Sequence, residues 1–290
     1  MQLWFVLIAV ILQWTACAHE NKVVLITGSS RGLGLAAARR LTAEGFTVYG
    51  VARSAPLSGD ESFYFAELDL LDSGALQAFV HGVIEKEGRI DVLINNAGYA
   101  LVGPVESLSR QEIQDQMEVN FLAPIQLIQE VLPSMRKQKS GHIINISSTN
   151  AFQTPPFGSI YSASKAALEN LSEALAVELQ PYGISVSIVE PGFIQTHFAL
   201  PIGTRNVPDN PYQKILSDMS SAIQERLAHP ENLSPSQTPE EVADFLFHVI
   251  QDPSPKLRYQ TSDAAREDVS QKLLDLTGDL YLEEMRKFFR

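Results

Sequence analysis

The sequence is poor in two kinds of residue that would define a class of function. It has a single cysteine, Cys17, among 290 residues. One thiol excludes an internal disulfide framework and a multi-cysteine metal site, so no metal is expected, and it is typical of a reducing compartment. Basic clusters are also missing from a chain whose formal net charge is -12. Because a nucleic-acid surface needs a basic stripe, the composition argues against nucleic acid as a partner.

The N-terminus lacks the basic segment of a secretory signal, since no Lys or Arg precedes Lys22. Residues 3–12 are an uninterrupted apolar run that small residues extend to position 18, which is short for a membrane-spanning helix of about 20 residues. Three interpretations of residues 1–20 stay open: a hydrophobic anchor that brings residues 3–18 to a membrane, a cleaved signal, or an appendage without function. We expect a cytoplasmic protein. If residues 3–18 are an anchor, they would also bring it to a membrane.

With 45% hydrophobic residues, the remaining segment 21–290 is long enough to bury one core. Short β-branched runs alternate with helical patterns, which demands right-handed crossovers and a parallel sheet. The predicted fold class is therefore α/β, a single domain with a doubly wound parallel sheet and helices on both faces. The expected strands, five or six in the alternating part and one short strand after it, are 23–26, 46–52, 63–68, 90–94, 142–146, 184–189 and 256–261.

A glycine-rich turn, Thr27-Gly-Ser-Ser-Arg-Gly-Leu-Gly34, separates the first strand from a helical segment at 35–41. Gly28, Gly32 and Gly34 let the backbone turn tightly and approach a phosphate, which amides at a helix N-terminus can bind. The position of the turn between a strand and a helix favours a dinucleotide site over plain turn chemistry.

Arginine stands where the cofactor's adenine ribose would be recognised. The second strand ends at Arg53, where a carboxylate would accept hydrogen bonds from the ribose hydroxyls of NAD. An arginine suits the 2′-phosphate of NADP instead, and Arg31 could add a second positive charge. NADP is therefore the preferred cofactor and NAD a possible one; both arginines could also be solvated loop residues.

Polar residues recur where the later strands end. Asp69 follows the third strand and could meet an adenine or cap a turn. The fourth strand closes with Asn95-Asn-Ala-Gly98, whose buried amides need a ribose or a neighbouring strand as partner. Asn120 lies inside a predicted helix at 110–137, which Pro124 and Pro133 should kink or split. Asparagine is a poor helix former, so this position conflicts locally with its surroundings, although a surface asparagine would explain it as well.

Tyr161 and Lys165 are four residues apart on a predicted helix that runs to Gln180, so they face the same way. An ammonium beside a phenol favours the phenolate, and we expect Lys165 to move the pKa of Tyr161 from about 10 towards neutrality. Such a tyrosine could act as a general acid or base. Ser147 and Ser148 end the preceding strand and place hydroxyls at the same sheet edge.

Residues 193–239 carry scattered prolines and are predicted to form a substrate lid. The tail 263–290 resembles two charged amphipathic helices. Aromatic residues in the loops suit either an apolar substrate or core packing, namely Tyr99, Phe152, Phe157, Phe193 and Phe198.

Together these motifs resemble the short-chain dehydrogenase/reductase family, whose fold is a Rossmann-type sheet, over nearly all of residues 22–198. The resemblance implies that Tyr161 is the acid/base, that Lys165 lowers its pKa and binds the nicotinamide ribose, that Ser148 hydrogen-bonds the substrate oxygen, and that Asn120 holds a water in the proton relay. Ser147 is the less favoured of the two serines. The implied cofactor contacts are Gly28, Ser30, Arg31, Gly32, Leu33, Gly34, Arg53, Asp69, Leu70, Asn96, Ala97, Gly98, Tyr161, Lys165, Pro191, Gly192 and Thr196.

The segment 255–262 and the helical tail look like the branch that contains estradiol 17-beta-dehydrogenase and the photoreceptor-type retinol dehydrogenases. The resemblance implies an NADP-dependent oxidoreductase that transfers a hydride between nicotinamide and a secondary alcohol or carbonyl of an apolar, steroid- or retinoid-like molecule. Its implied substrate contacts are Ser148, Tyr99, Phe152, Phe157 and Phe193. An NAD-preferring dehydrogenase of another alcohol and a catalytically silent dinucleotide sensor stay as alternatives. By analogy with the family, the expected assembly is a homodimer.

Overall fold

The computed structural model describes residues 22–56, 62–196, 198, 211–218, 221, 236–274, 277 and 282–283. The expectations for residues 1–20 therefore lie outside the described residues, as does most of the proposed lid. Within the described ranges, no helix is both long and apolar enough to cross a bilayer. Residues 213–218, within the proposed lid, are helical.

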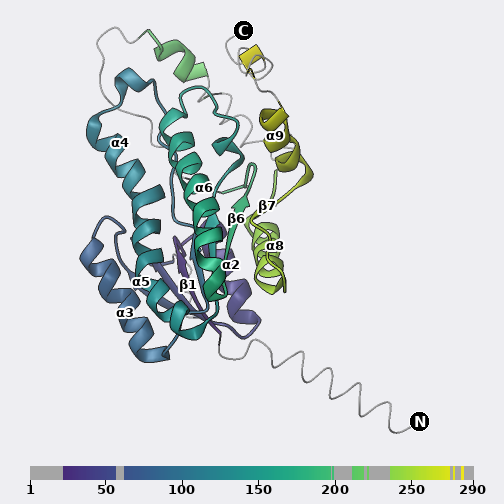
Figure 1. Ribbon diagram of the computed structural model, residues 1–290. Helices are drawn as coiled ribbons and strands as arrows, with labels where there is room; N and C mark the ends of the chain where they lie inside the picture. The colour runs from purple at the N-terminus through teal and green to yellow at the C-terminus, as the bar shows by residue number, and fades with distance from the viewer. Residues whose placement is uncertain are drawn as a thin grey trace.

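Seven parallel strands form one sheet in the order β3-β2-β1-β4-β5-β6-β7 (Figure 1). The order reverses between β1 and β4, which is where doubly wound sheets bind ligands beyond the carboxyl ends of their strands. Most of the strand residues are buried and apolar, as expected for a parallel sheet covered on both faces. The strand bounds are β1 Val23–Thr27, β2 Thr47–Ala52, β3 Tyr64–Glu67, β4 Val92–Asn95, β5 Gly141–Ile146, β6 Ile184–Glu190 and β7 Arg258–Gln260.

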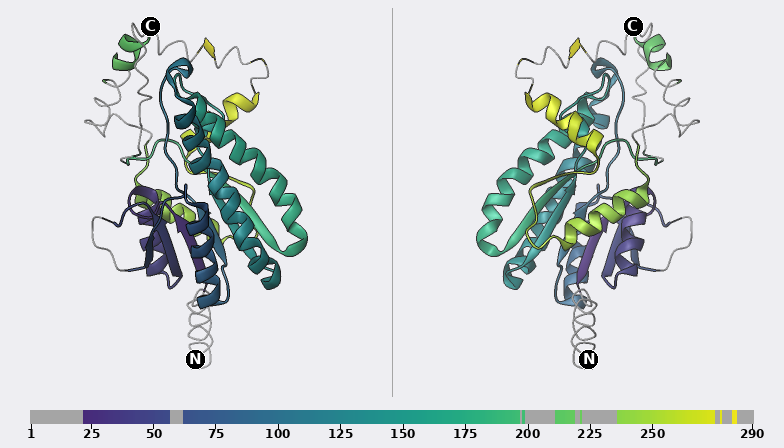
Figure 2. Two further views of the ribbon diagram at one scale, coloured as in Figure 1. Left: turned by 90° about the vertical axis from the view of Figure 1, so that its left-hand side faces the viewer. Right: turned by 90° about the vertical axis from the view of Figure 1, so that its right-hand side faces the viewer.

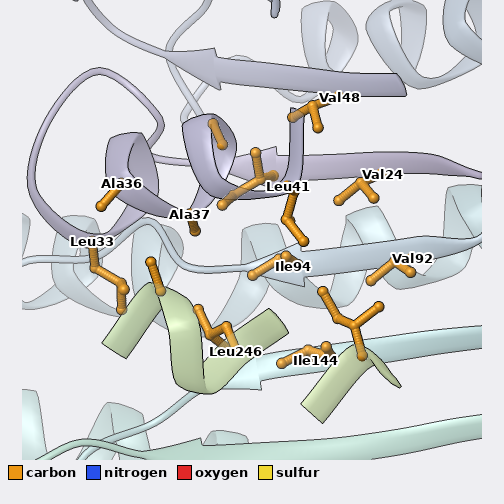
Figure 3. Packing of buried hydrophobic residues seen from close by; sticks show 14 of the residues in the cluster. Val24, Leu33, Ala36, Ala37, Leu41, Val48, Val92, Ile94, Ile144 and Leu246 are labelled. Carbon is orange, nitrogen blue, oxygen red and sulfur yellow. The ribbon is translucent and has the colours of Figure 1, made fainter. Parts of the chain in front are cut away.

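Helices cover both faces of the sheet (Figure 2). On one face, α2 (Gly32–Ala43) and α8 (Pro239–Gln251) pack on each other and on the strands, and Figure 3 shows Leu246 of α8 inside that cluster. On the other face, α3 (Ser73–Glu87) and α5 (Ala123–Gln138) form the second apolar cluster together with the end of α6 (Ser159–Leu179). A further helix, α9 (Asp263–Leu274), follows β7.

The predicted sheet and its crossovers are confirmed, and the strand bounds differ from those expected by one or two residues at most ends. The alternating part contributes six strands and the short strand near residue 258 pairs with β6 as the seventh, through Ile188–Glu190 and Arg258–Gln260. The helix α3 begins after Asp72, whose side chain caps its N-terminus, and ends at Gly88, which has a φ of 74° in the left-handed conformation.

The single helix expected over residues 110–137 is divided, as its prolines suggested, but the break lies before them. The helix α4 (Arg110–Met117) passes through a π-helical turn, η2 (Glu118–Leu122), into α5. Pro124 occupies the first turn of α5, directly after the π-turn. Asn120 lies inside the π-turn and is fully buried, so it is neither a mid-α-helix residue nor a surface one. Such turns are frequent at functional sites.

Candidate active site

The glycine turn forms a cradle at the start of α2. Gly28 and Gly32 have φ values of +71° and +55°, in the left-handed region that favours glycine. A Cβ at Gly34 would lie 2.2 Å from the Gly28 carbonyl oxygen, so no larger residue fits where the helix meets the turn. The N-terminus of α2 carries no side-chain cap and no acidic residue in its first turn. Its amides are therefore suited to a phosphate, and these residues fit a dinucleotide.

The end of β4 is tied to this turn by side chains. Asn96 Nδ2 donates to the Thr27 carbonyl oxygen at 2.8 Å, and Thr27 Oγ1 accepts from the amides of Asn96 and Ala97 at 3.1 and 2.9 Å. Asn95 donates to Asn145 Oδ1 on the neighbouring strand at 2.8 Å. Neighbouring strands thus accept hydrogen bonds from the amide nitrogens of both side chains, whereas the buried Asn95 Oδ1 has no partner among the described residues.

The catalytic candidates come together at the same edge. Tyr161 and Lys165, one turn apart on α6, are 7% and 4% exposed. Ser148, which follows β5, forms a hydrogen bond with the Tyr161 phenol, and its Oγ also accepts from the Asn150 amide at 3.1 Å. Lys165 Nζ donates to the Ile146 carbonyl oxygen at 2.7 Å and lies 6.0 Å from the centroid of the Tyr161 ring.

The expected lowering of the Tyr161 pKa is wrong for this structure. Burial raises the pKa of Tyr161 to about 12, and the hydrogen bond with Ser148 opposes that shift only in part. The ammonium of Lys165 is directed at the end of β5, and burial lowers the pKa of Lys165 itself to about 8. Desolvation therefore outweighs the opposing effect of Ser148, and Tyr161 is a protonated phenol at neutral pH.

Asn120 connects the loop that follows β4 with α6 through hydrogen bonds. Its Nδ2 donates to the Tyr99 carbonyl oxygen at 3.0 Å and to Ser164 Oγ at 3.1 Å, and its Oδ1 accepts from the Tyr99 amide at 3.2 Å. A Cβ at Gly98 would lie 3.2 Å from Asn120 Oδ1 and 3.6 Å from Lys165 Nζ. Gly98, at the end of the Asn-Asn-Ala-Gly motif, therefore lies close to both Asn120 and Lys165.

Two residues that the sequence did not single out complete this arrangement. Gln116, fully buried, donates to the Tyr99 carbonyl oxygen at 2.8 Å and accepts from the Leu101 amide at 2.6 Å. Ser164, inside the Tyr-x-x-x-Lys motif, donates to the Tyr161 carbonyl oxygen at 2.6 Å. A buried glutamine in a polar helix carries no pattern of its own, so only its position in the fold marks Gln116.

The remaining cofactor candidates differ in exposure. Arg31, just before α2, and Arg53, just after β2, are both exposed. Asp69 Oδ1 accepts from the Leu71 amide at 3.1 Å, so it caps a turn in this structure. Thr196 lies beside the turn, with its Cγ2 3.2 Å from a Cβ placed on Gly32. The other candidates at this edge are Ser30, Leu33, Leu70, Pro191 and Gly192.

The aromatic residues fall into separate groups. Phe198 lies against Tyr161, with ring centroids 5.9 Å apart, and Phe193 is 47% exposed nearby in sequence. Phe157 has a φ of 63°, a strained conformation for a bulky residue, and packs against Tyr212 beside a cavity of about 300 Å³. Phe152 instead lies under the guanidinium of Arg258, 5.2 Å from its ring centroid. The structure therefore brings only part of this set to the catalytic tyrosine.

This combination of a glycine turn on a doubly wound sheet with a buried Ser-Tyr-Lys set defines a dinucleotide-dependent oxidoreductase. The family model for short chain dehydrogenase matches residues 22–206, and the chain belongs to that family. It is accordingly an NAD(P)-dependent oxidoreductase that acts on CH–OH groups.

Several relatives of known name are similar to the chain. A 3-ketodihydrosphingosine reductase from Bacteroides thetaiotaomicron is 40% identical over 62% of this chain and 66% of its own length. Human 17-beta-hydroxysteroid dehydrogenase type 1 is 32% identical over 91% of this chain and 85% of its own, and bovine retinol dehydrogenase 8 is 31% identical over 91% and 89%. The resemblance to steroid and retinol dehydrogenases is thereby confirmed.

Solved structures share the fold. A short-chain dehydrogenase from Streptomyces avermitilis is 31% identical, with a TM-score of 0.77 over 93% of this chain and 98% of its own. A metagenomic short-chain oxidoreductase in complex with NADP is 30% identical, with a TM-score of 0.63 over 83% and 97%.

Proposed function

We propose that the protein is an NADP-dependent oxidoreductase that interconverts a carbonyl and a secondary alcohol on an apolar small molecule of steroid, retinoid or related lipid type. The observation that carries the proposal is the buried Tyr161 phenol, hydrogen-bonded to Ser148 and set one turn from Lys165 at the edge that holds the glycine turn. Bound nicotinamide would supply or accept the hydride.

The side chains divide the proton chemistry among them. Tyr161, whose pKa is raised to about 12, is protonated at neutral pH and donates its proton to a carbonyl oxygen during reduction. Ser148 hydrogen-bonds the same oxygen and fixes its position beside the phenol. Lys165 holds a ribose hydroxyl, and Asn120 orders the water that returns a proton towards Tyr161. In the oxidation direction, the phenol first loses its proton through the same relay, and the resulting phenolate accepts the alcohol proton.

The apolar substrate is supported by the surroundings of Tyr161 and by the relatives. Phe198, whose ring lies 5.9 Å from that of Tyr161, is 42% exposed, which suits an apolar ligand. The relatives' names include a steroid dehydrogenase, a retinol dehydrogenase and a reductase of a long-chain ketone. We expect the segment 193–239 to act as the substrate lid and the protein to form a homodimer, which light scattering would measure.

A preference for NADP is supported by Arg53, an exposed cation at the end of β2 where NAD-dependent relatives of this fold would carry a carboxylate. Arg31 stands at the start of α2, within the turn that would bind the pyrophosphate. The NADP-bound structural relative is consistent with this preference.

The test is a panel of steroids, retinals, long-chain ketones and simple ketones, each with NADPH and NADH. We expect turnover of an apolar carbonyl with NADPH, and we expect Tyr161→Phe to reduce kcat by several orders of magnitude while NADPH binding is retained. Substantial activity in that variant would overturn the mechanism. Tight NADPH binding with no turnover across the panel would favour the silent sensor instead.

A further inference from the structure

A cluster of buried charges lies behind the catalytic lysine. Glu169 follows Lys165 by one turn of α6 and is 4% exposed, and Glu190 at the end of β6 is fully buried. Arg258 of β7 binds both carboxylates: its Nη1 pairs with Glu169 Oε2 and lies 2.7 Å from Glu190 Oε1. Its other nitrogen, Nη2, pairs with Glu173, which is half exposed. Charged groups from α6, β6 and β7 therefore meet directly behind the active site.

With both carboxylates ionised, the buried charges balance only when Lys165 is protonated. Two carboxylates, Glu169 and Glu190, face two cations, Lys165 and Arg258, and uncompensated buried charge is costly. Arg258 cannot lose its proton under ordinary conditions, so Lys165 is the cation whose charge is adjustable. If Lys165 were neutral, one buried carboxylate would lack a counter-charge.

Among the groups around Lys165, Glu169 is the carboxylate that affects its protonation. The neighbours that β5 presents to Lys165 and Glu169 are neutral, the Ile146 carbonyl and the Ser147 hydroxyl, and the π-turn presents the neutral Asn120. Ser147 favours the charged form of Glu169, although Ser147 Oγ and Glu169 Oε1 both fall short of hydrogen-bond geometry. Glu190 opposes the ionisation of Glu169, and Arg258 supports it.

We propose that Glu169, held by Arg258, is a positioning residue whose carboxylate keeps Lys165 protonated and so sets the alkaline limit of catalysis. The proposal rests on the oxidoreductase function described above, in which Lys165 must be an ammonium. It also links β7, which lies outside the residues matched by the family model, to the catalytic lysine.

The pKa values of the two groups give the proposal a definite pH range. Burial raises the pKa of Glu169 to about 7, while burial lowers the pKa of Lys165 to about 8 against the attraction of Glu169. Both groups therefore change charge near neutral pH. In acid, where Glu169 is neutral, a glutamine there should behave as the wild type does; as the pH rises and Glu169 ionises, the two should diverge.

The test is an NMR titration of the Lys165 ε-carbon in protein labelled at lysine, with the signal assigned through Lys165→Met. In Glu169→Gln we expect the Lys165 midpoint to fall by about one pH unit, and the alkaline limb of kcat/KM to fall with it. Glu169→Asp keeps the charge and should restore most of the shift. The matched control is Glu173→Gln, which removes the exposed partner of Arg258 and should leave the midpoint unchanged.

An unchanged midpoint in Glu169→Gln would overturn the proposal. If that variant does not fold, the wild-type titration decides: the Lys165 signal should show a second, smaller step near the midpoint of Glu169, and a single-step curve would contradict the linkage. The NMR readout does not require turnover. An enzyme inactive on every substrate but with a shifted Lys165 midpoint would therefore count against the proposed function and leave the Glu169 assignment standing.

Discussion

The two halves of the carboxyl edge are made in different ways. The half that would hold the dinucleotide is built from glycine and backbone, with Gly28 N donating to the Val51 carbonyl oxygen at 2.7 Å and Gly34 pressed against Gly28. The catalytic half is built from buried polar side chains, with Asn120, Lys165 and Glu169 each held by partners distant in the chain.

The two halves should tolerate different kinds of substitution. A backbone cradle fails when any atom is added to it, because no side chain can move aside. A network of buried side chains fails when an atom is removed, because its partners are left without hydrogen bonds in a medium that water does not reach. Added and deleted atoms should therefore separate the two halves experimentally.

The largest effect is expected for Gly34→Ala. Its Cβ would lie 2.2 Å from the Gly28 carbonyl oxygen and 2.5 Å from Asn96 Nδ2, and backbone cannot withdraw without opening the turn. We expect a loss of about 3 kcal/mol or more in the free energy of unfolding, measured by denaturant titration, together with loss of NADPH binding. A variant that binds NADPH normally would show that the cradle is not rigid.

The second largest effect is expected for Asn120→Ala, which deletes the amide group of a buried side chain in the catalytic half. Three hydrogen bonds to Tyr99 and Ser164 are lost, so we expect the free energy of unfolding to fall by about 2–4 kcal/mol. The control is Asn170→Ala on α6, whose exposed side chain bonds only the Ala166 carbonyl oxygen and should cost under about 0.5 kcal/mol. Equal losses in the two variants would refute the distinction between the buried network and the surface.

Arg53→Ala should discriminate between the cofactors without disturbing the fold. Because Arg53 is exposed and would contact only the 2′-phosphate, we expect KM for NADPH to rise about tenfold or more while KM for NADH stays within about threefold. Steady-state kinetics with both cofactors measure the two constants. A similar rise for both would remove the reason to prefer NADP.

The smallest effect is expected for Gly82→Ala, the same substitution made at an open position of α3. A Cβ at Gly82 would meet nothing within 4 Å, on an exposed turn of α3. Alanine lowers the entropy of the unfolded chain, so stability should rise by about 0.5–1 kcal/mol in the same denaturant titration. A loss of stability in this variant would mean that α3 needs Gly82 for a reason other than its backbone freedom.

The same contrast explains what could be predicted from the sequence. The strands, the glycine turn between the first strand and helix, and the spacing of Tyr161 and Lys165 on one helix follow from local periodicity. The π-turn at Asn120 could not be predicted, because its extra residue leaves no mark on a helical pattern already broken by prolines. The direction of the Tyr161 pKa shift depends on how deeply the fold buries the ring. Arg258 and Glu169, 89 residues apart, meet only in the folded sheet.

The helix α8 has a consequence for how the chain folds as it is synthesised. The apolar cluster formed with α3, α5 and α6 uses residues between Val23 and Val186, whereas the cluster on the opposite face needs Val242 to Ile250 of α8 (Figure 3). A ribosome must therefore release nearly the whole chain before that second face can close. Until then the apolar face of the sheet that α2 and α8 cover stays open to water and to chaperones.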